Sequence, residues 1–413
     1  MKRTIVLAEY QPYRLPMSAL PTIAAERLWR DYQPFVAIDF PTPKTADEWQ
    51  LTAQGWVGMI PVTRELTLVL QPKVPIANLL GMVEVAYGLE SFHLLAGQVM
   101  ASTIPDLYDR LTRLLVERIL AQIQRGLYRP TQLHEERTTY VRGRLQIREL
   151  IRQPLQVGVP CVYHEPSVDV IENRILYWTL HRILQGGLAT DGTQALARRA
   201  LRILQPVITL EPYRPIDCRG RRYTRLNHDY ASLHALCAFF LEACGPSHLP
   251  GDVESVPFVV NMARLYEQFV AAWLQTHLSV TWQLQIQERH PLSGELHFAI
   301  DLVLYDREKG RPIAVLDTKY KRPDYGPDTA DVAQIVAYAA AKGVADAILI
   351  YPQSLTAPLD TVVGGVRVRT LVFALDGNLD RAGQQFSEQL NRLSNRPGIC
   401  PIPGLSARST KDR

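Results

Sequence analysis

The sequence lacks cysteines in C-x-x-C spacing, a G-x-x-x-x-G-K-[ST] loop and any long apolar run. Its five cysteines are scattered, which argues against an iron–sulfur or zinc cluster and fits free thiols in a reducing compartment. Without the phosphate-binding loop, the chain is not expected to hydrolyse nucleotides as a P-loop motor does. No stretch reaches the ~18 apolar residues of a membrane span. We therefore expect a cytoplasmic protein with no membrane partner.

Lysine is also scarce, with eight in 413 residues. Between Ser102 and Val256 the chain has twenty arginines and no lysine, against sixteen Asp and Glu. Arginine suits phosphate oxygens because its guanidinium donates two hydrogen bonds at once, although codon bias in a GC-rich genome explains the excess equally well. Arginines cluster at positions 214, 219, 221, 222 and 225. Within this cluster we expect Arg219, Arg221 and Arg222 to contact DNA.

The length of 413 residues indicates two or three domains, and 47% hydrophobic with 21% charged residues is typical of a globular protein. The hydrophobic periodicity predicts an α+β multidomain protein. We expect a β-rich module over residues 1–100, a mainly helical middle region over 101–255, an α/β domain with a mixed sheet over 256–395, and a loose tail over 396–413.

In the middle region, apolar residues at helical spacing predict several long helices. These are expected at Ile104–Leu127, Ile171–Leu184, Thr193–Ile203 and Asp229–Cys244. The segment TTYVRGRLQIREL alternates like a pair of strands. Arg142, Arg144 and Arg174 could contact DNA or a partner, but salt bridges that lock the helices to the sheet are the better interpretation.

The C-terminal domain has two strand patterns separated by a polar turn. The first runs from about Glu295 to Tyr305 with Asp301 facing away from its alternating apolar residues, and the second runs from Ile313 to Lys321. In the second strand the period of two puts Asp317 and Lys319 on one face. A hairpin would therefore bring two carboxylates and an ammonium together.

This combination suits metal-dependent phosphodiester hydrolysis. Mg²⁺ takes one or two protein carboxylates and keeps water and phosphate oxygens as its other ligands. A lysine beside the metal can orient the attacking water and offset the charge that develops on the phosphate. Solvated surface charges on an exposed hairpin are the competing interpretation.

The helices predicted before and after this hairpin supply further candidate site residues. The apolar stripe of Val259–Thr276 predicts a helix with Glu267 at the margin of the stripe. Asp328–Lys342 predicts a helix that ends at Gly343 and carries Gln334 and Tyr338 four residues apart on one face. A strand over Ala347–Tyr351 follows, which completes an α/β layer.

The ordered set of helix Glu, strand Asp, D-x-K and Q-x-x-x-Y resembles the PD-(D/E)xK nuclease superfamily. More narrowly, the chain resembles the McrC-type nuclease subunits of McrBC restriction systems in NMARLYEQFV, AIDLVLY, VLDTKYK and DVAQIVAYA. The N-terminal segments LAEYQPYRL and GWVGMIPVTRELTLVLQPKVPIANLL also resemble this family. One departure is Ile300, which stands where the superfamily name has proline.

The resemblance implies a Mg²⁺-dependent DNA endonuclease subunit of a 5-methylcytosine-dependent restriction complex. Asp301, Asp317 and Glu267 would hold the metal, Lys319 would position water, and Gln334 and Tyr338 would shape the cleft. It also implies a GTP-hydrolysing AAA+ McrB-type ring as partner, which reads methylated cytosine and translocates, while the N-terminal part of this chain enters the ring and stimulates hydrolysis. Two alternatives are a non-catalytic activator of a AAA+ ring and a stand-alone DNA repair nuclease.

Overall fold

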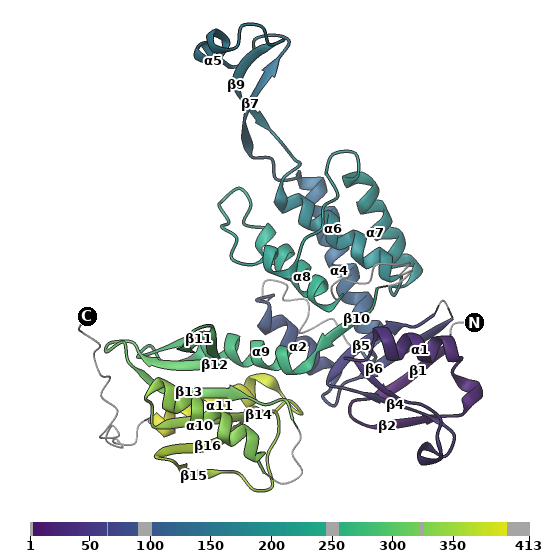
Figure 1. The fold of residues 1–413 in the computed structure, drawn as a ribbon, viewed down its shortest axis with the longest axis vertical. Coiled ribbons are helices and arrows are strands. Elements are labelled where there is room, and N and C mark those ends of the chain that lie inside the picture. The colour runs from purple at the N-terminus through teal and green to yellow at the C-terminus, as the bar shows by residue number, and fades with distance from the viewer. Residues whose placement is uncertain (1–2, 64, 90–100, 245–255, 322–325, 395–413) are drawn as a thin grey trace. The chain divides into compact units, whose positions relative to one another are not determined.

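The computed structural model describes residues 3–63, 65–89, 101–244, 256–321 and 326–394. It is a mixed α+β protein, as predicted, and its chain divides into two compact units (Figure 1). Met1–Leu107 and Val259–Arg413 belong to the first unit, and Tyr108–Phe258 forms the second. The tail expected over 396–413 lies outside the described residues.

The N-terminal part of the first unit contains two sheets. In the larger one, β6 (Leu66–Gln71) lies between β1 (Arg3–Ala8), with which it is parallel, and β5 (Trp56–Pro61), with which it is antiparallel. The sheet ends with β10 (Phe258–Asn261). The smaller sheet has the order β2 (Pro12–Leu15), β4 (Trp49–Ala53), β3 (Val36–Asp39). Helix α1 (Thr22–Asp31) adds Leu28 to the core that the sheets enclose.

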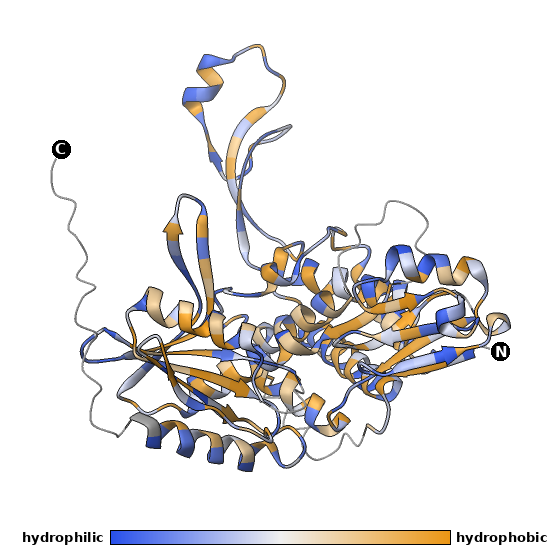
Figure 2. Ribbon diagram, turned by 60° about the horizontal axis from the view of Figure 1, so that its bottom comes forward, coloured by the Kyte–Doolittle hydropathy of each residue, from blue (hydrophilic) through white to orange (hydrophobic). Residues whose placement is uncertain are grey.

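The C-terminal part of the first unit contains a mixed sheet of six described strands. Its order is β11 (Trp282–Ser293), β12 (Leu296–Asp306), β13 (Pro312–Thr318), β14 (Asp346–Tyr351), β16 (Val366–Val372) and β15 (Asp360–Val363). Strands β13, β14 and β16 are mutually parallel, whereas the strands at both edges are antiparallel. Strand β14 is buried on both faces, and the central strands are hydrophobic along most of their length (Figure 2). Covering helices on both faces explain this composition.

Three helices pack on this sheet. Helix α10 (Thr329–Lys342) buries Ile335 and Ala339 against residues of β13, β14 and β16, and it ends at Gly343 in the left-handed conformation, as predicted. Helix α9 (Met262–His277) and helix α11 (Leu379–Ser394) meet where Phe373 packs between aromatic residues of both.

Helix α9 begins later than its apolar pattern predicted. Residues 259–261 form part of β10, and the side chain of Asn261 accepts a hydrogen bond of 3.0 Å from the backbone N–H of Arg264. Two consecutive valines favour a strand because β-branched side chains restrict helical rotamers, and asparagine is a preferred helix N-cap. The helix therefore starts at Met262. The D-x-K strand is also shorter than predicted, since β13 ends at Thr318.

The N-terminal and C-terminal parts of the first unit are joined by helix α2 (Ile76–Ala86). This helix packs against α9. The amide Nδ2 of Asn78 donates hydrogen bonds of 2.8 Å to the backbone oxygens of Leu375 and Gly377. Residues expected to form a separate module therefore share one compact unit with the C-terminal sheet.

The second unit is mostly helical, as expected of the middle region. Its long helices are α4 (Ile104–Arg125), α6 (Ile171–Gly186), α7 (Asp191–Leu204) and α8 (Tyr230–Ala243). A three-stranded sheet of β7 (Thr131–Thr138), β9 (Val159–Pro166) and β8 (Arg144–Leu145) extends away from these helices (Figure 1).

The strand pair predicted for TTYVRGRLQIREL is only partly present. The segment contains the short β8, but Ile147–Arg152 forms helix α5. Isoleucine and leucine at positions 147, 150 and 151 also fit helical spacing, so the period of a short segment does not distinguish the two structures. Among the described residues, no helix combines the length and the apolar character that crossing a membrane requires.

Candidate active site

The antiparallel pairing of β12 and β13 brings the two predicted strand aspartates together. Leu302 pairs with Leu316, and by the same register Asp301 and Asp317 are opposite one another at the next position. Each carboxyl group is close enough to shift the pKa of the other, and the backbone of Thr318 lowers the pKa of Asp301. Two adjacent carboxylates beside the single ammonium of Lys319 carry more negative charge than that ammonium balances.

Both carboxyl groups have a raised pKa. For Asp301 the main cause is burial, followed by the charge of Glu267. For Asp317, which is 2% exposed, burial again raises the pKa most, and repulsion from Asp301 adds to it against the opposing effect of Lys319. Buried like charges disfavour the ionised form. A cation bound here would relieve that cost.

Lys319 lies beside the pair, as its spacing from Asp317 predicted. Its Nζ is 2.7 Å from Asp317 Oδ2 and donates a 2.9 Å hydrogen bond to Gln334 Oε1. Gln334 Nε2 in turn donates a 2.8 Å hydrogen bond to the Tyr338 hydroxyl. The Q-x-x-x-Y pair of α10 therefore holds the lysine in addition to the aspartate.

Glu267 on α9 is half-buried near the same aspartates. Burial raises its pKa, Gln287 and Arg264 lower it, and Asp317 raises it. Gln287 Nε2 donates a hydrogen bond to Glu267 Oε1. The carboxylate is thus close enough to interact electrostatically with the aspartate pair.

Gln287 is a residue that the sequence pattern did not indicate. It lies on β11 between the pairs Ile286–Leu302 and Glu288–Ile300, and therefore opposite Asp301. Its φ of 50° is in the left-handed region, which is unfavourable for a side chain other than glycine, asparagine or aspartate. Strain of this kind is concentrated at functional sites. A non-glycine residue in this conformation leaves no signal in the sequence.

Asp331 is a second residue that the pattern missed. It is 5% exposed and accepts hydrogen bonds of 2.8 and 3.0 Å from Lys321 Nζ. Its Oδ1 also lies 3.7 Å from Lys319 Nζ. Its position three residues before Gln334 on the same helix was the available signal.

Mg²⁺ is the ion that the sequence predicts for this site. Within the described parts of the chain, no group of three or more His, Cys, Asp or Glu side chains is arranged to hold a metal ion. The pair Asp301 and Asp317 meets the usual requirement of Mg²⁺ for one or two carboxylates, and its poorly balanced charge fits a cation. Glu267 as a third ligand stays a prediction.

The predicted DNA-binding arginines lie in the second unit. Arg219 pairs with Glu242 at 2.9 Å and Arg221 with Glu172 at 2.7 Å. Arg222 is exposed and makes no ion pair with any described residue. Arg222 is therefore the most available of the three for a phosphate, whereas Arg221, half-buried, holds its loop to α6.

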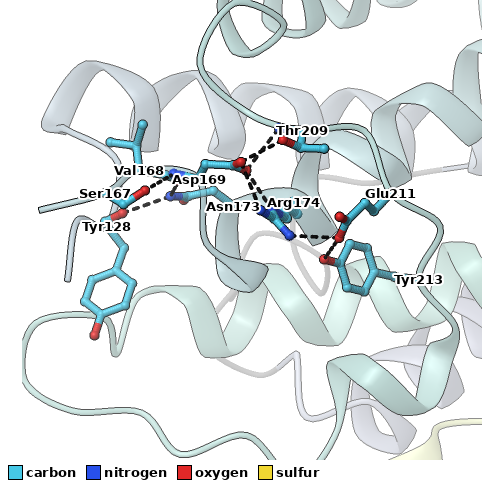
Figure 3. A network of polar contacts seen from close by, with 9 residues as sticks. All are labelled: Tyr128, Ser167, Val168, Asp169, Asn173, Arg174, Thr209, Glu211 and Tyr213. Carbon is cyan, nitrogen blue, oxygen red and sulfur yellow. Dashed lines mark hydrogen bonds and ion pairs between the residues drawn. The ribbon is translucent and has the colours of Figure 1, made fainter. Parts of the chain in front are cut away.

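Arg174 makes salt bridges, as the preferred interpretation of the sequence held, although neither carboxylate partner belongs to a sheet. It binds Asp169 through two hydrogen bonds of 2.6 and 2.9 Å and Glu211 through one of 2.8 Å (Figure 3). Asp169 also accepts hydrogen bonds from the backbone N–H and the hydroxyl of Thr209. These contacts join the start of α6 to the segment after α7. Arg142 similarly pairs with Glu165 at 3.0 Å.

Comparison with known proteins gives consistent matches. A family model described as McrBC 5-methylcytosine restriction system component matches residues 51–352, a range that includes all six candidate active-site residues. No curated protein matches the chain.

Among solved structures, the chain is similar to one in the refined half-complex from a tetradecameric assembly of Thermococcus gammatolerans McrB AAA+ hexamers with bound McrC. The identity is 19% over 95% of this chain and 100% of that chain, and the TM-score is 0.58. A cryo-EM structure of the Thermococcus gammatolerans McrBC complex matches at 20% identity over 67% of this chain and 88% of that chain, with a TM-score of 0.46. The first of these likenesses shows a shared fold.

Proposed function

Because the chain belongs to the McrBC 5-methylcytosine restriction system component family, we propose that it is the McrC-type subunit that cuts DNA in a modification-dependent restriction complex. The observation that carries this proposal is the pair of half-buried Asp301 and buried Asp317, with Lys319 Nζ 2.7 Å from Asp317 Oδ2. This arrangement supports the proposal that the C-terminal sheet and its helices form a PD-(D/E)xK nuclease domain with a Q-x-x-x-Y helix.

In this proposal Asp301 and Asp317 are the residues that would hold Mg²⁺. When bound, the ion would polarise the phosphate and lower the pKa of a coordinated water. Lys319 donates hydrogen bonds to the attacking water and to the phosphate oxygens on which charge develops. Gln334 and Tyr338 keep the lysine in place, because a displaced catalytic group loses much of its effect.

The partner proposed is a GTP-hydrolysing AAA+ McrB-type ring, and the substrate is DNA that contains 5-methylcytosine. The similar structure contains McrB AAA+ hexamers with bound McrC, and the present sequence has no P-loop of its own. A motor in another subunit would therefore supply translocation.

One surface of the second unit suits a protein partner. Around α5 the side chains of Ile151, Leu155 and Val157 are 72%, 97% and 92% exposed. Exposed apolar side chains gathered at one site mark interaction surfaces. This surface is a second candidate for ring binding beside residues 1–100, whose role stays a prediction.

The experiment that tests the function is cleavage of methylated plasmid DNA by the purified chain, with and without the ring partner, in Mg²⁺ or EDTA. The proposal predicts Mg²⁺-dependent cleavage only with the partner and GTP. Cleavage without any partner would favour the stand-alone nuclease. Stimulated GTP hydrolysis with no cleavage would favour the non-catalytic activator.

A further inference from the structure

Glu9 of the N-terminal part is bonded to Tyr320, the residue that directly follows Lys319 in the chain. The Tyr320 hydroxyl donates a 3.3 Å hydrogen bond to Glu9 Oε2, and the two residues are only 8% and 2% exposed. Both belong to the first unit of the structure. The contact therefore joins the end of β1 to the chain beside the candidate catalytic lysine.

The carboxyl group of Glu9 is costly to bury. Its Oε2 also accepts a 3.4 Å hydrogen bond from the backbone N–H of Lys73, whereas its Oε1 accepts none from any described residue. Burial raises the pKa of Glu9, and Lys73 and Tyr320 lower it. A buried carboxyl group with an unpaired oxygen lowers the free energy of unfolding relative to an apolar residue. We therefore expect the contact with Tyr320 to serve a purpose other than stability.

The backbone around Glu9 is fixed on both sides of this residue. The N–H of Glu9 donates a 3.2 Å hydrogen bond to Gln71, and the N–H of Tyr10 donates one of 2.9 Å to Ala53. The φ of Tyr10 is 59°, in the left-handed region, which is unfavourable for tyrosine. Strain of this kind persists where the surrounding structure imposes it, and it is concentrated at functional sites. Glu9 is thus a rigid acceptor.

The chain at Lys319 has little support from the sheet itself. Strand β13 ends at Thr318, and the backbone N–H of Lys319 donates one further hydrogen bond, of 2.9 Å, to Ile350 of β14. The Cα of the next residue is only 3.8 Å from that of Lys319 across a trans peptide. The position of Tyr320 therefore determines the backbone from which the lysine side chain extends.

Tyr320 is held at both its ring and its hydroxyl. The ring centre lies 6.0 Å from that of Tyr266 on α9, the residue before Glu267. The hydroxyl binds Glu9 of the N-terminal part. Ring packing alone allows a ring to slide and turn in its plane, whereas a directional hydrogen bond to a rigid acceptor does not. The contact with Glu9 therefore supplies the precision of this support.

We propose that Glu9 is a positioning residue of the nuclease site, which acts through Tyr320 to fix the backbone at Lys319. Neither Glu9 nor Tyr320 needs to touch the substrate. A misplacement of about 1 Å can cost a catalytic group ~100-fold in rate. The inference rests on the proposed function, and it gives a part in DNA cleavage to a region that the sequence associated only with the ring partner.

The first test is Tyr320→Phe in the complete complex, with single-turnover cleavage of methylated plasmid measured over a range of protein concentrations. The variant keeps the aromatic ring beside Tyr266 and the contact of Glu9 with Lys73, and loses only the hydroxyl. We expect the maximal rate to fall by about 10-fold. The protein concentration that gives half of this rate should stay unchanged, because the lysine is displaced while DNA binding is not altered.

Tyr305→Phe is the matched control. It also removes a hydroxyl that donates to a carboxylate, at 2.9 Å to Glu288 Oε2, in the same sheet but four positions from Asp301 along β12. We expect cleavage at the wild-type rate. Urea denaturation of both variants shows whether each is folded and how much stability each has lost.

Substitutions of Glu9 test whether the hydroxyl acts through this carboxyl group. Glu9→Gln should cleave at nearly the wild-type rate, because its amide oxygen can take the place of Oε2 and its nitrogen the place of the unpaired Oε1. Glu9→Ala should lose about as much as Tyr320→Phe. The double variant of Glu9→Ala and Tyr320→Phe should be no slower than either, because both changes remove the same contact.

Three results would each overturn the positioning role of Glu9 alone. These are a wild-type maximal rate for folded Tyr320→Phe, an equal loss for Tyr305→Phe, and losses that multiply in the double variant. Tyr320→Phe and Glu9→Gln decide the question if Glu9→Ala does not fold. Failure of the wild-type complex to cleave methylated DNA would instead overturn the proposed function.

Discussion

Lys319 Nζ lies 2.7 Å from Asp317 Oδ2, and it also donates a hydrogen bond to Gln334 Oε1. A charged lysine between a carboxylate and an amide oxygen has a defined position before any substrate arrives. The arrangement links the hairpin of β12 and β13 to helix α10. It also predicts which substitutions should affect cleavage and which should affect only stability.

Tyr338→Phe should slow DNA cleavage while Lys319 remains chemically intact. The substitution removes the hydroxyl that accepts the 2.8 Å hydrogen bond from Gln334, and Gln334 then orients the lysine less well. We expect a loss of about 10-fold in the single-turnover rate, less than for removal of the lysine itself. Lys319→Ala is the reference variant. Equal losses for Tyr338→Phe and Lys319→Ala, or no loss for either, would contradict this order.

Asp331→Asn should lower stability. Asp331 is 5% exposed and binds Lys321 through two hydrogen bonds, but the Lys321 side chain is 47% exposed, so solvent replaces part of what is lost. We expect a decrease of about 1–2 kcal/mol in the free energy of unfolding, measured by urea denaturation. Asp328→Asn, which removes the more exposed partner of the same lysine, is the matched control and should cost less.

Stability should fall below neutral pH because of His234. This side chain is fully buried, and burial lowers its pKa to about 4 from the ordinary 6.5. The Nε2 atom donates to the backbone oxygen of Glu172, so Nδ1 must accept from the Tyr223 hydroxyl.

The direction of this change in stability with pH follows from proton binding by His234 in the unfolded chain. Above pH 6.5 the imidazole is neutral in both states, whereas between 6.5 and about 4 only the unfolded chain takes up the proton. We therefore expect about 2 kcal/mol less stability at pH 5 than at pH 7. His234→Gln should remove this part of the pH dependence, and an identical pH profile for wild type and variant would contradict the assignment.

Substitution of Arg222 and substitution of Arg221 should have different effects on DNA binding and on stability. Arg222 is exposed, so Arg222→Ala should reduce the salt slope of DNA binding by about one unit with no change in stability. Arg221 pairs with Glu172 at 2.7 Å and both side chains are mostly buried, so Arg221→Ala should instead destabilise the second unit. Thermal unfolding and anisotropy measured on both variants separate these outcomes. An unchanged slope for Arg222→Ala would contradict the prediction that the arginine cluster binds DNA.

The sequence predicted the contacts that depend on strand and helix periods. The spacing of Asp317 and Lys319, and of Gln334 and Tyr338, placed each pair on one face. The structure joins the first pair by an ion pair and the second by a hydrogen bond. These relationships are local. The period of two or 3.6 residues is enough to find them.

Other residues of the site could not be found in this way. Glu9 contacts Tyr320 across 311 positions of the chain, and the φ of Gln287 depends on the packing around it. Neither relationship leaves a periodic signal. The arginine excess likewise did not show that Arg219 and Arg221 already have carboxylate partners, because those ion pairs also join distant segments.

Separation of cutting from ring stimulation requires point substitutions. Helix α2 packs against α9, and β10 belongs to the N-terminal sheet. Deletion of the chain beyond about residue 256 would therefore expose the core of the N-terminal part. A substitution within the carboxylate pair avoids this difficulty because it preserves the fold.

The most direct test is Asp317→Asn in the complete complex, with methylated plasmid cleavage and GTP hydrolysis by the ring partner measured on the same preparation. The side chain keeps its shape but loses the charge that would hold Mg²⁺. We predict a loss of about 100-fold or more in cleavage, with wild-type stimulation of GTP hydrolysis. Cleavage at the wild-type rate by the folded variant would contradict the assignment of Asp301, Asp317 and Lys319 as the nuclease site.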